Sequence, residues 1–330
     1  MEKSRSWIIG VAVSVTALII AFWGVRPGRL LDALSGANYF FLVPASFTIL
    51  LGLAARSRSW QILLDNRISL RRTFDALNEG YLLNTVLPFR LGELARSYIV
   101  SQVLGSSAVA ILATVLLERV IDTLVSFVGL IVALPFVISP NWTTNLVWGV
   151  AVILLLIILG VAILLSQRKK LVSFMGKLPG MGFWGLDRAA DDFIGSLESL
   201  MDLKRLLLAG FWSMVAWATT WVQLWLILQM FRIHGSIVVS LFVSGVIAFG
   251  AAIPSSPGAV GVFELSAIAG LLVFGVSRES ALSFAIVAHL LQLSMTGLFG
   301  SWALAREGRT ILDLAERTRE FIRKARNKEE

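Results

Sequence analysis

The chain has 330 residues, of which 57% are hydrophobic and 15% charged, and it contains no cysteine. This composition excludes a soluble domain with a single core, a disulfide framework and a thiol-based metal or redox site. The formal net charge of +8 indicates contact with anionic lipid, and we expect no nucleic-acid partner. The sequence therefore predicts an all-α polytopic membrane protein.

Six stretches are long and apolar enough to cross the hydrocarbon layer, which requires about 20 residues of helix. The first follows Lys3 and Arg5. It is too long for a signal peptide and has no convincing cleavage site, so we interpret it as a retained anchor. The six predicted spans are residues 7–25, 38–55, 106–138, 143–166, 206–231 and 281–304.

Two further apolar regions, at about 74–100 and 236–275, are interrupted by proline and glycine. Residues 84–96 read NTVLPFRLGELAR, and residues 253–264 read IPSSPGAVGVFE. Lipid cannot hydrogen-bond the backbone that a turn exposes, so breaks at membrane depth survive only where protein or a watery cavity covers them. We predict that each region is a re-entrant helical hairpin, which returns to the side it came from.

This topology places most of the 29 lysines and arginines in cytoplasmic segments, as the positive-inside rule requires. Those segments include the arginines between residues 56 and 72 and a basic loop at 167–205. Both termini are then cytoplasmic, in a plasma or inner membrane. Only four arginines lie outside, namely Arg26, Arg29, Arg232 and Arg278.

The two halves of this topology are inverted repeats. Residues 1–138 contain two spans, a hairpin from the cytoplasmic side and a span. Residues 139–305 repeat that order with a hairpin from the outside, and 306–330 form a basic cytoplasmic tail. Inverted repeats with broken helices are a recurring transporter design, with the binding site near the bilayer midplane.

The breakers also suggest an anion site. Pro88 and Pro257 lack the N–H that a turn would leave unpaired, and proline is favoured in a first helical turn. Gly92, Gly258 and Gly261 permit tight turning or close backbone approach. We expect a helix directly after each proline, with free N–H groups and partial positive charge facing the membrane interior.

The first hairpin carries a charged stripe, since Arg90, Glu93 and Arg96 are spaced so that Glu93 can pair with either arginine on a helix. The alternative to a functional role is that these charges only hold the hairpin in place. Asn84 precedes it, and is expected either to hydrogen-bond the first half-helix or to contact substrate.

The predicted span 106–138 carries Glu118, Arg119 and Asp122 near its centre. A charge there costs about 2.5–3.5 kcal/mol on the insertion scale, which points to function or to a static clamp between helices. The same alternatives hold for a second polar set, in which Glu264 follows the second break and His289 and Gln292 lie on the last span.

We hypothesise that a phosphate head group replaces a carboxylate on Arg90 or Arg96, helped by bidentate guanidinium geometry. A displaced Glu93 or Glu264 would then take up a proton, which would allow coupling to a proton gradient.

The two breaks together carry a recognisable pattern, N-x3-P-x-R-x-G-E-x2-R followed by P-x2-P-G-x2-G-x2-E. It resembles the flippase-like integral membrane family, whose best-known relative is the membrane portion of the lysylphosphatidylglycerol synthase/flippase. Ala259 stands where the family often has a second glycine. No soluble aminoacyl-transferase domain is expected, so the resemblance implies movement of a lipid between leaflets without lipid aminoacylation. The matching residues are Asn84, Pro88, Arg90, Gly92, Glu93, Arg96, Pro254, Pro257, Gly258, Gly261 and Glu264.

Two other functions stay open, an intramembrane lipid-modifying enzyme and a transporter of small anions. The enzyme is disfavoured because the chain shows no nucleophile–base pair and no metal motif. Its two histidines, His234 and His289, lie far apart, so we expect no metal and no cofactor. The predicted partners are membrane lipids with an anionic head group, and a homo-oligomer is left open.

Overall fold

The computed structural model describes residues 2–87, 91–137, 202–253, 255–314 and 316. Every regular element in these ranges is a helix. The predicted span 143–166 lies outside them, as do nearly all of the loop 167–205 and most of the tail 306–330.

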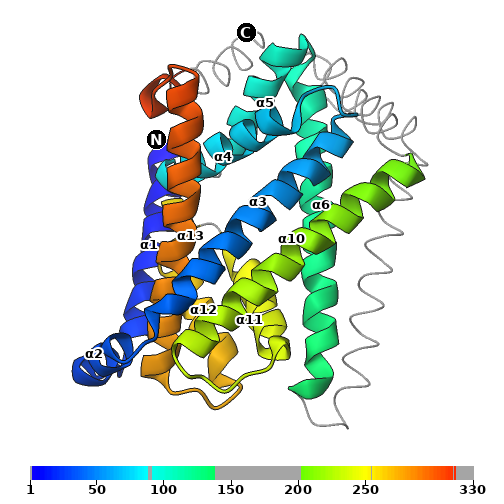
Figure 1. Ribbon diagram of the computed structural model, residues 1–330. Helices are drawn as coiled ribbons and strands as arrows, with labels where there is room; N and C mark the ends of the chain where they lie inside the picture. Colours follow the sequence, from blue (N-terminus) through cyan, green and yellow to red (C-terminus); the bar gives the residue numbers. More distant parts are fainter. Residues whose placement is uncertain (1, 88–90, 138–201, 254, 315, 317–330) are drawn as a thin grey trace, which may run out of the picture.

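The helices follow one another as a bundle with two inserted hairpins (Figure 1). Short 3₁₀ turns occur at Tyr39–Phe41 (η1), Leu134–Phe136 (η3) and Pro257–Ala259 (η5). The α-helices are α1 (Glu2–Phe22), α2 (Pro27–Ser35), α3 (Leu42–Leu63), α4 (Leu70–Val86), α5 (Leu91–Leu104), α6 (Ala108–Ala133), α10 (Leu203–Met230), α11 (Ile237–Ala251), α12 (Val262–Leu272) and α13 (Arg278–Arg306).

Three described segments are long and apolar enough to cross a membrane, namely Tyr39–Leu63, Leu203–Met230 and Arg278–Arg306. A fourth is added if α1 and α2, which are bent by 85°, count as one span. The 26 residues of α6 reach about 39 Å, but three charged side chains interrupt its apolar sequence near the middle. These lengths and the absence of strands from the described ranges agree with a polytopic helical membrane protein.

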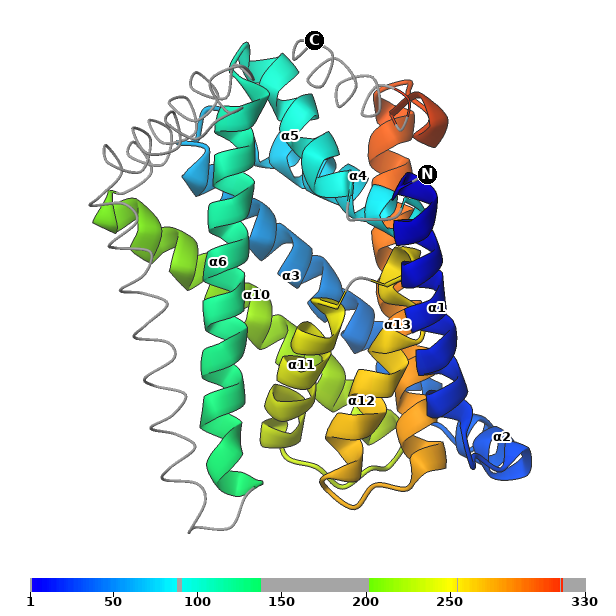
Figure 2. The same ribbon diagram turned by 180° about the vertical axis from the view of Figure 1, so that it is seen from behind.

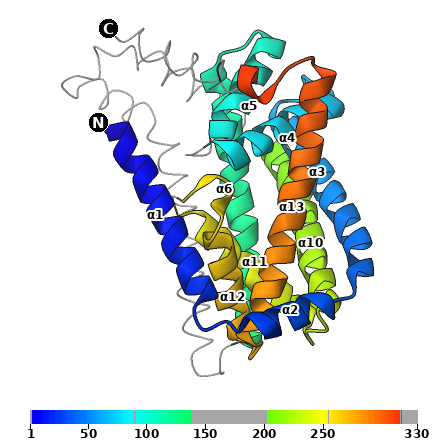
Figure 3. The same cartoon turned by 90° about the vertical axis from the view of Figure 1, so that its left-hand side faces the viewer.

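The bend between α1 and α2 was not predicted. The chain turns at Gly24, whose φ of +73° is accessible to glycine at little cost, and Pro27 then starts α2. No residue of α2 is buried, and the helix lies across one end of the bundle (Figure 3).

The two hairpins lie at opposite ends of the bundle. Helices α4 and α5 share one end with the start of α1 and the end of α13, whereas the loops flanking α11 and α12 lie at the end that holds α2 (Figures 1 and 2). Their helices cover 70–104 and 237–272, close to the predicted limits of 74–100 and 236–275.

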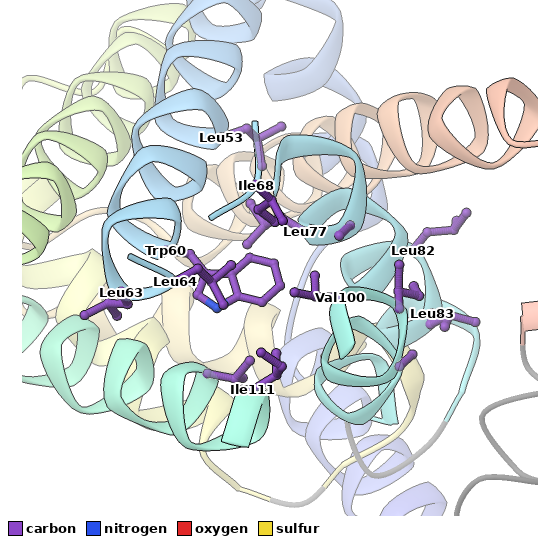
Figure 4. Packing of buried hydrophobic residues seen from close by; sticks show 14 of the residues in the cluster. Leu53, Trp60, Leu63, Leu64, Ile68, Leu77, Leu82, Leu83, Val100 and Ile111 are labelled. Carbon is purple, nitrogen blue, oxygen red and sulfur yellow. The ribbon is translucent and has the colours of Figure 1, made fainter. Parts of the chain in front are cut away.

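Each hairpin is anchored in its own apolar cluster. The first cluster packs Trp60 of α3 against Leu77, Leu83 and Val100 of the first hairpin (Figure 4). The second joins α11 and α12 to the ends of α10 and α13, through residues that include Ile227, Val243, Ile268 and Phe284. Apolar packing therefore fixes the two hairpins independently.

The arms of the first hairpin touch backbone to backbone. A Cβ atom on Gly92 of α5 would lie 1.9 Å from the carbonyl oxygen of Gly80 on α4. No side chain fits in that space, so glycine at position 92 is required by the approach of the two helices.

Candidate functional site

A cavity of about 810 Å³ lies where the two interrupted regions meet. The end of α4 contributes Asn84, Thr85 and Leu87, and the second break contributes Ser255 to Ala259. The turn at Pro257 packs directly against α4. Residues of α1, α3, α5, α6, α10, α11, α12 and α13 complete the wall. Two helix breaks that are far apart in sequence therefore face one chamber.

Arg119 of α6 is the arginine that joins the first hairpin to the cavity. Its Nε lies 3.6 Å from Oε1 of Glu93 on α5, and its Nη2 lies 3.4 Å from Oε1 of Glu118. Arg119 and Glu93 both line the cavity. Within the described residues Glu93 thus pairs with an arginine on another helix, and not with Arg96; Arg90, the other expected partner, lies outside those residues.

Arg96 points away from the cavity, into the apolar cluster. It is 1% exposed, and its Nη2 lies 2.9 Å from Oε2 of Glu118. Its guanidinium also lies 4.7 Å above the ring of Trp60, whose Nε1 donates to Thr114 Oγ1. Arg96 and Glu118 form a buried clamp between α5 and α6. Of the two arginines hypothesised to bind phosphate, Arg96 does not line the cavity and Arg90 lies outside the described residues, whereas Arg119 does line it.

A second ion pair joins Arg56 of α3 to Asp122 of α6. Asp122 Oδ1 also accepts a hydrogen bond of 2.6 Å from Ser213 Oγ, and Arg56 lies 5.6 Å from the centre of the Trp217 ring. The predicted span end at residue 55 is corrected here, because α3 continues to Leu63 within the candidate span Tyr39–Leu63 and carries Arg56 along the cavity wall.

Asn84 couples the two arms of the first hairpin. Its Oδ1 accepts a hydrogen bond of 2.8 Å from the backbone N–H of Gly92, in the first turn of α5. We had expected Asn84 to hydrogen-bond its own helix, the first half of the hairpin. Its side chain instead hydrogen-bonds the second arm. Asn84 also lines the cavity, whereas Pro88 and Arg90 lie outside the described residues.

The second break differs from the expected helix directly after Pro257. A 3₁₀ turn comes first, with φ of +70° at Gly258 and +56° at Ala259, and α12 begins only after Gly261 at φ +87°. A Cβ on Gly261 would lie 2.5 Å from the Ser14 carbonyl oxygen of α1. This glycine therefore meets both an unusual backbone angle and a close helix contact.

The carboxylate of Glu264 hydrogen-bonds the backbone at the start of α12 and contacts His289 of α13. The Gly261 N–H donates to Glu264 Oε2 at 2.6 Å, and His289 Nδ1 lies 2.7 Å from Oε1. One N–H at the start of α12 is thus bound by a carboxylate of this chain, which lies where an external anion was expected. His289 Nε2 lies 2.9 Å from the Gly258 carbonyl oxygen, and Phe263 stacks on the imidazole.

These contacts determine how many protons Glu264 and His289 share. A carbonyl oxygen can only accept, so Nε2 must carry hydrogen. One further proton must then lie between Nδ1 and Oε1, either on imidazolium or on a carboxylic acid. The pair is neutral overall, and removing that proton breaks the contact with Glu264 or the contact with Gly258.

A family model described as "Lysylphosphatidylglycerol synthase TM region" matches residues 7–300. The chain belongs to this family. The resemblance found in the two motifs is thereby confirmed, and the chain is a multi-pass membrane protein. The lysylphosphatidylglycerol synthase TM region is associated with lipid flipping and is usually taken as the flippase part, distinct from the catalytic domain. A search of curated proteins finds no match.

The structure divides the predicted site of this family member into two layers. Some residues form the cavity wall, and others hold the wall residues from behind. No group of three or more potential metal ligands occurs among the described residues. The wall contains Asn84, Glu93, Arg119, Asp122, Pro257, Gly258, His289 and Gln292, whereas Arg96, Glu118, Gly261 and Glu264 lie behind it.

Sequence reasoning missed the hydroxyl side chains of the wall. They come from spans that otherwise looked uniformly apolar, and the one available signal was the pair Thr219 and Thr220 with Gln223 inside the predicted span 206–231. The polar wall residues that were not predicted are Thr48, Arg56, Tyr81, Thr85, Thr123, Ser126, Thr219, Thr220, Gln223, Ser255, Ser256 and Thr296.

Proposed function

We propose that this protein moves a lipid with an anionic head group between membrane leaflets, through the cavity at which the two hairpins meet. The observation that carries this proposal is the shared cavity, lined by both helix breaks and by two arginines. Hairpins from opposite ends support the inverted repeats 1–138 and 139–305, a design that exposes one site to each side in turn.

The border of the cavity favours a lipid over a small anion. Phe249 and Ile253 line it and are 44% and 51% exposed. An aqueous vestibule would have polar side chains there, whereas acyl chains need an apolar path.

Arg119 is the best-placed ligand for the head-group phosphate. Its contact with Glu93 is 3.6 Å long, and both side chains are partly exposed, whereas Arg96 and Glu118 are fully buried at 2.9 Å. A phosphate can replace Glu93 on the guanidinium with a stronger, bidentate contact. Glu93 is then an unpaired carboxylate in a low-dielectric wall, which is energetically unfavourable. Proton uptake by Glu93 would remove this unfavourable charge.

The shared proton of Glu264 and His289 offers a route for coupling. His289 lines the same cavity and holds the Gly258 turn, so loss of the proton would release part of the wall. The other titratable side chains that the described residues present to the cavity are Arg56, Tyr81, Glu93, Arg119 and Asp122. Helices α1 and α11 present none from their described residues.

The test uses purified protein in vesicles with fluorescent phosphatidylglycerol and a quencher that reaches only the outer leaflet. Arg119→Ala is expected to reduce transbilayer movement at least about tenfold, because one charge-assisted contact contributes on the order of 1.5–3 kcal/mol. Arg71→Ala is the matched control, since Arg71 is exposed and away from the cavity. Equal rates for the wild type and Arg119→Ala would remove this arginine from the site.

A further inference from the structure

Helix α2 turns out of the direction in which the long helices cross the membrane. It makes an angle of 85° with α1 and packs against α13 near one end of the bundle (Figure 3). The Tyr39 hydroxyl donates to the Leu34 carbonyl oxygen of α2 at 2.8 Å. The Asn38 N–H donates to the Met230 carbonyl oxygen of α10 at 2.9 Å. These bonds tie α2 to the bundle, so it lies along the plane of the membrane.

The sides of α2 differ in chemistry. Leu30 and Leu34 are partly buried, and Leu30 packs against the second apolar cluster. Leu31 is 65% exposed, and Arg29 is exposed as well. Consecutive residues of a helix are about 100° apart, so Leu31 and Arg29 lie on nearly opposite sides. The helix therefore presents an apolar side chain in one direction and a charged one in the other.

Aromatic side chains flank α2 along the chain. Trp23 precedes the helix and is 72% exposed, and Tyr39 and Phe40 follow it and are exposed too. Tryptophan and tyrosine are enriched where the hydrocarbon layer meets the head groups. Since Tyr39 and Phe40 open the candidate span Tyr39–Leu63, the exposed apolar surface continues from α2 into a membrane-crossing helix. The level of α2 is thus that of the lipid head groups.

The charge of this segment distinguishes among lipid head groups. Arg26 and Arg29 are exposed, and neither guanidinium has an ion-pair partner within the described ranges. Asp32 is the one acidic residue between Phe22 and Phe41, so positive charge is in excess there. An amphipathic helix with a basic polar side is attracted to anionic lipids.

We propose that α2 is an interfacial helix that binds anionic phospholipids of the leaflet at its end of the bundle. Leu31 enters the acyl region, and Arg26 and Arg29 contact the phosphates. No residue of α2 lines the cavity, so this lipid surface is separate from the site of the proposed translocation. The occupant is lipid and not a protein, because the exposed apolar side of α2 is continuous with that of a span.

The test measures which lipid lies next to α2. The natural chain has no cysteine, so Leu31→Cys gives a single site for a bimane fluorophore. The labelled full chain is placed in vesicles of equal parts phosphatidylglycerol and phosphatidylcholine. A quenching nitroxide is carried on the acyl chains of one lipid or of the other. We expect phosphatidylglycerol to quench about fivefold more strongly, because one basic side chain near an anionic surface contributes about that factor.

The double substitution Arg26→Gln and Arg29→Gln should bring the ratio of the two quenching constants to about one. Arg67→Gln with Arg71→Gln is the matched control, which should keep the ratio. Arg67 and Arg71 are also exposed, but they lie at the start of the first hairpin, at the other end of the bundle (Figure 1). If the first double variant fails to fold, salt replaces it. Raising salt from about 0.1 M to about 1 M shortens the Debye length from about 10 Å to about 3 Å and should lower the ratio likewise.

Each contrary outcome removes a stated part of the proposal. Absence of quenching by both nitroxide lipids would place α2 outside the bilayer and overturn it. Equal quenching by the two lipids would overturn the binding of anionic lipid, and an unchanged ratio in the Arg26 and Arg29 variant would overturn the role of these arginines. No lipid is moved between leaflets in this measurement, so none of these results bears on the proposed function.

Discussion

The first hairpin is built around permanent charges, and the second around one shared proton. Helix α5 meets α6 through two arginine–glutamate pairs, Arg96–Glu118 and Arg119–Glu93. In the second hairpin, no arginine or lysine occurs between Ile237 and Leu272, and Glu264 is held instead by His289 and a backbone N–H.

Under the proposed function, we expect this difference to give separate tasks to two similar sequence motifs. Guanidinium groups stay charged at any physiological pH, so the first hairpin can attract an anion continuously. An imidazole–carboxylate pair can lose or keep one proton, so the second hairpin can respond to the side of the membrane that it faces. Each of the following experiments tests one half of this comparison.

The largest expected effect is on folding of the first hairpin. Gly92→Ala places a methyl group against the Gly80 carbonyl oxygen, and neither backbone can yield without separating α4 from α5. We expect a loss of about 3 kcal/mol or more, seen as a lower unfolding temperature in detergent. Gly210→Ala in α10 is the control, because nothing lies within 4 Å of the added carbon. Similar behaviour of both variants would contradict the tight contact.

Removal of Arg96 should cost a similar amount, because Glu118 would remain buried with only its longer, 3.4 Å contact to Arg119. Breaking a buried ion pair costs about 3–5 kcal/mol. The check is thermal unfolding of Arg96→Ala beside Arg119→Ala, whose partly exposed side chain should affect transport far more than stability. If Arg96→Ala proved stable but inactive, Arg96 would belong with the substrate ligands.

Substitutions at the shared proton should change the pH response of transport while sparing the fold. His289→Gln retains an amide that can donate to Gly258, but it cannot carry the extra proton. We expect its transport rate, measured with a pH difference imposed across the vesicle membrane, to become independent of that difference. Glu264→Gln should behave alike. The same variants measured at equal pH on both sides serve as controls. If both variants still responded fully to the pH difference, the proton shared by Glu264 and His289 would have no part in transport.

The smallest expected effect is at Ala259, which adopts a φ of +56°. Left-handed backbone costs a residue with Cβ roughly 1 kcal/mol relative to glycine, so Ala259→Gly should raise stability slightly in thermal unfolding. Ala267→Gly, inside α12 and buried, should lower it by a similar amount. A destabilised Ala259→Gly variant would show that the turn is not strained.

The positions of the two breaks could be predicted from sequence, since proline and glycine inside apolar segments have direct backbone consequences. Glu118 and Asp122 could likewise be placed within a helix of the membrane region, because an apolar run surrounds them. Their partners could not be predicted. Whether Glu93 meets Arg96 or Arg119 depends on the rotation of α5 against α6, which apolar packing around Trp60 sets.

Arg56 and the serine and threonine hydroxyls of the cavity wall were missed for a related reason. An arginine near the expected end of a span looks like a cytoplasmic anchor, and a threonine in an apolar helix looks neutral to the bilayer. Only the arrangement of α3, α6 and α10 shows that these side chains share one wall. The 85° bend between α1 and α2 was missed as well, because the first apolar stretch was predicted as one span over residues 7–25.

The contact of Gly80 with Gly92 also limits how the protein can move. Because the two backbones touch at these glycines, we expect α4 and α5 to move together as one unit, which we call the wedge. Any rocking must occur at the wedge's two connections, where Asp65, Asn66 and Gly105 adopt positive φ. A covalent cross-link between α4 and α5 would then leave this motion free, whereas a cross-link between α5 and α6 would prevent it.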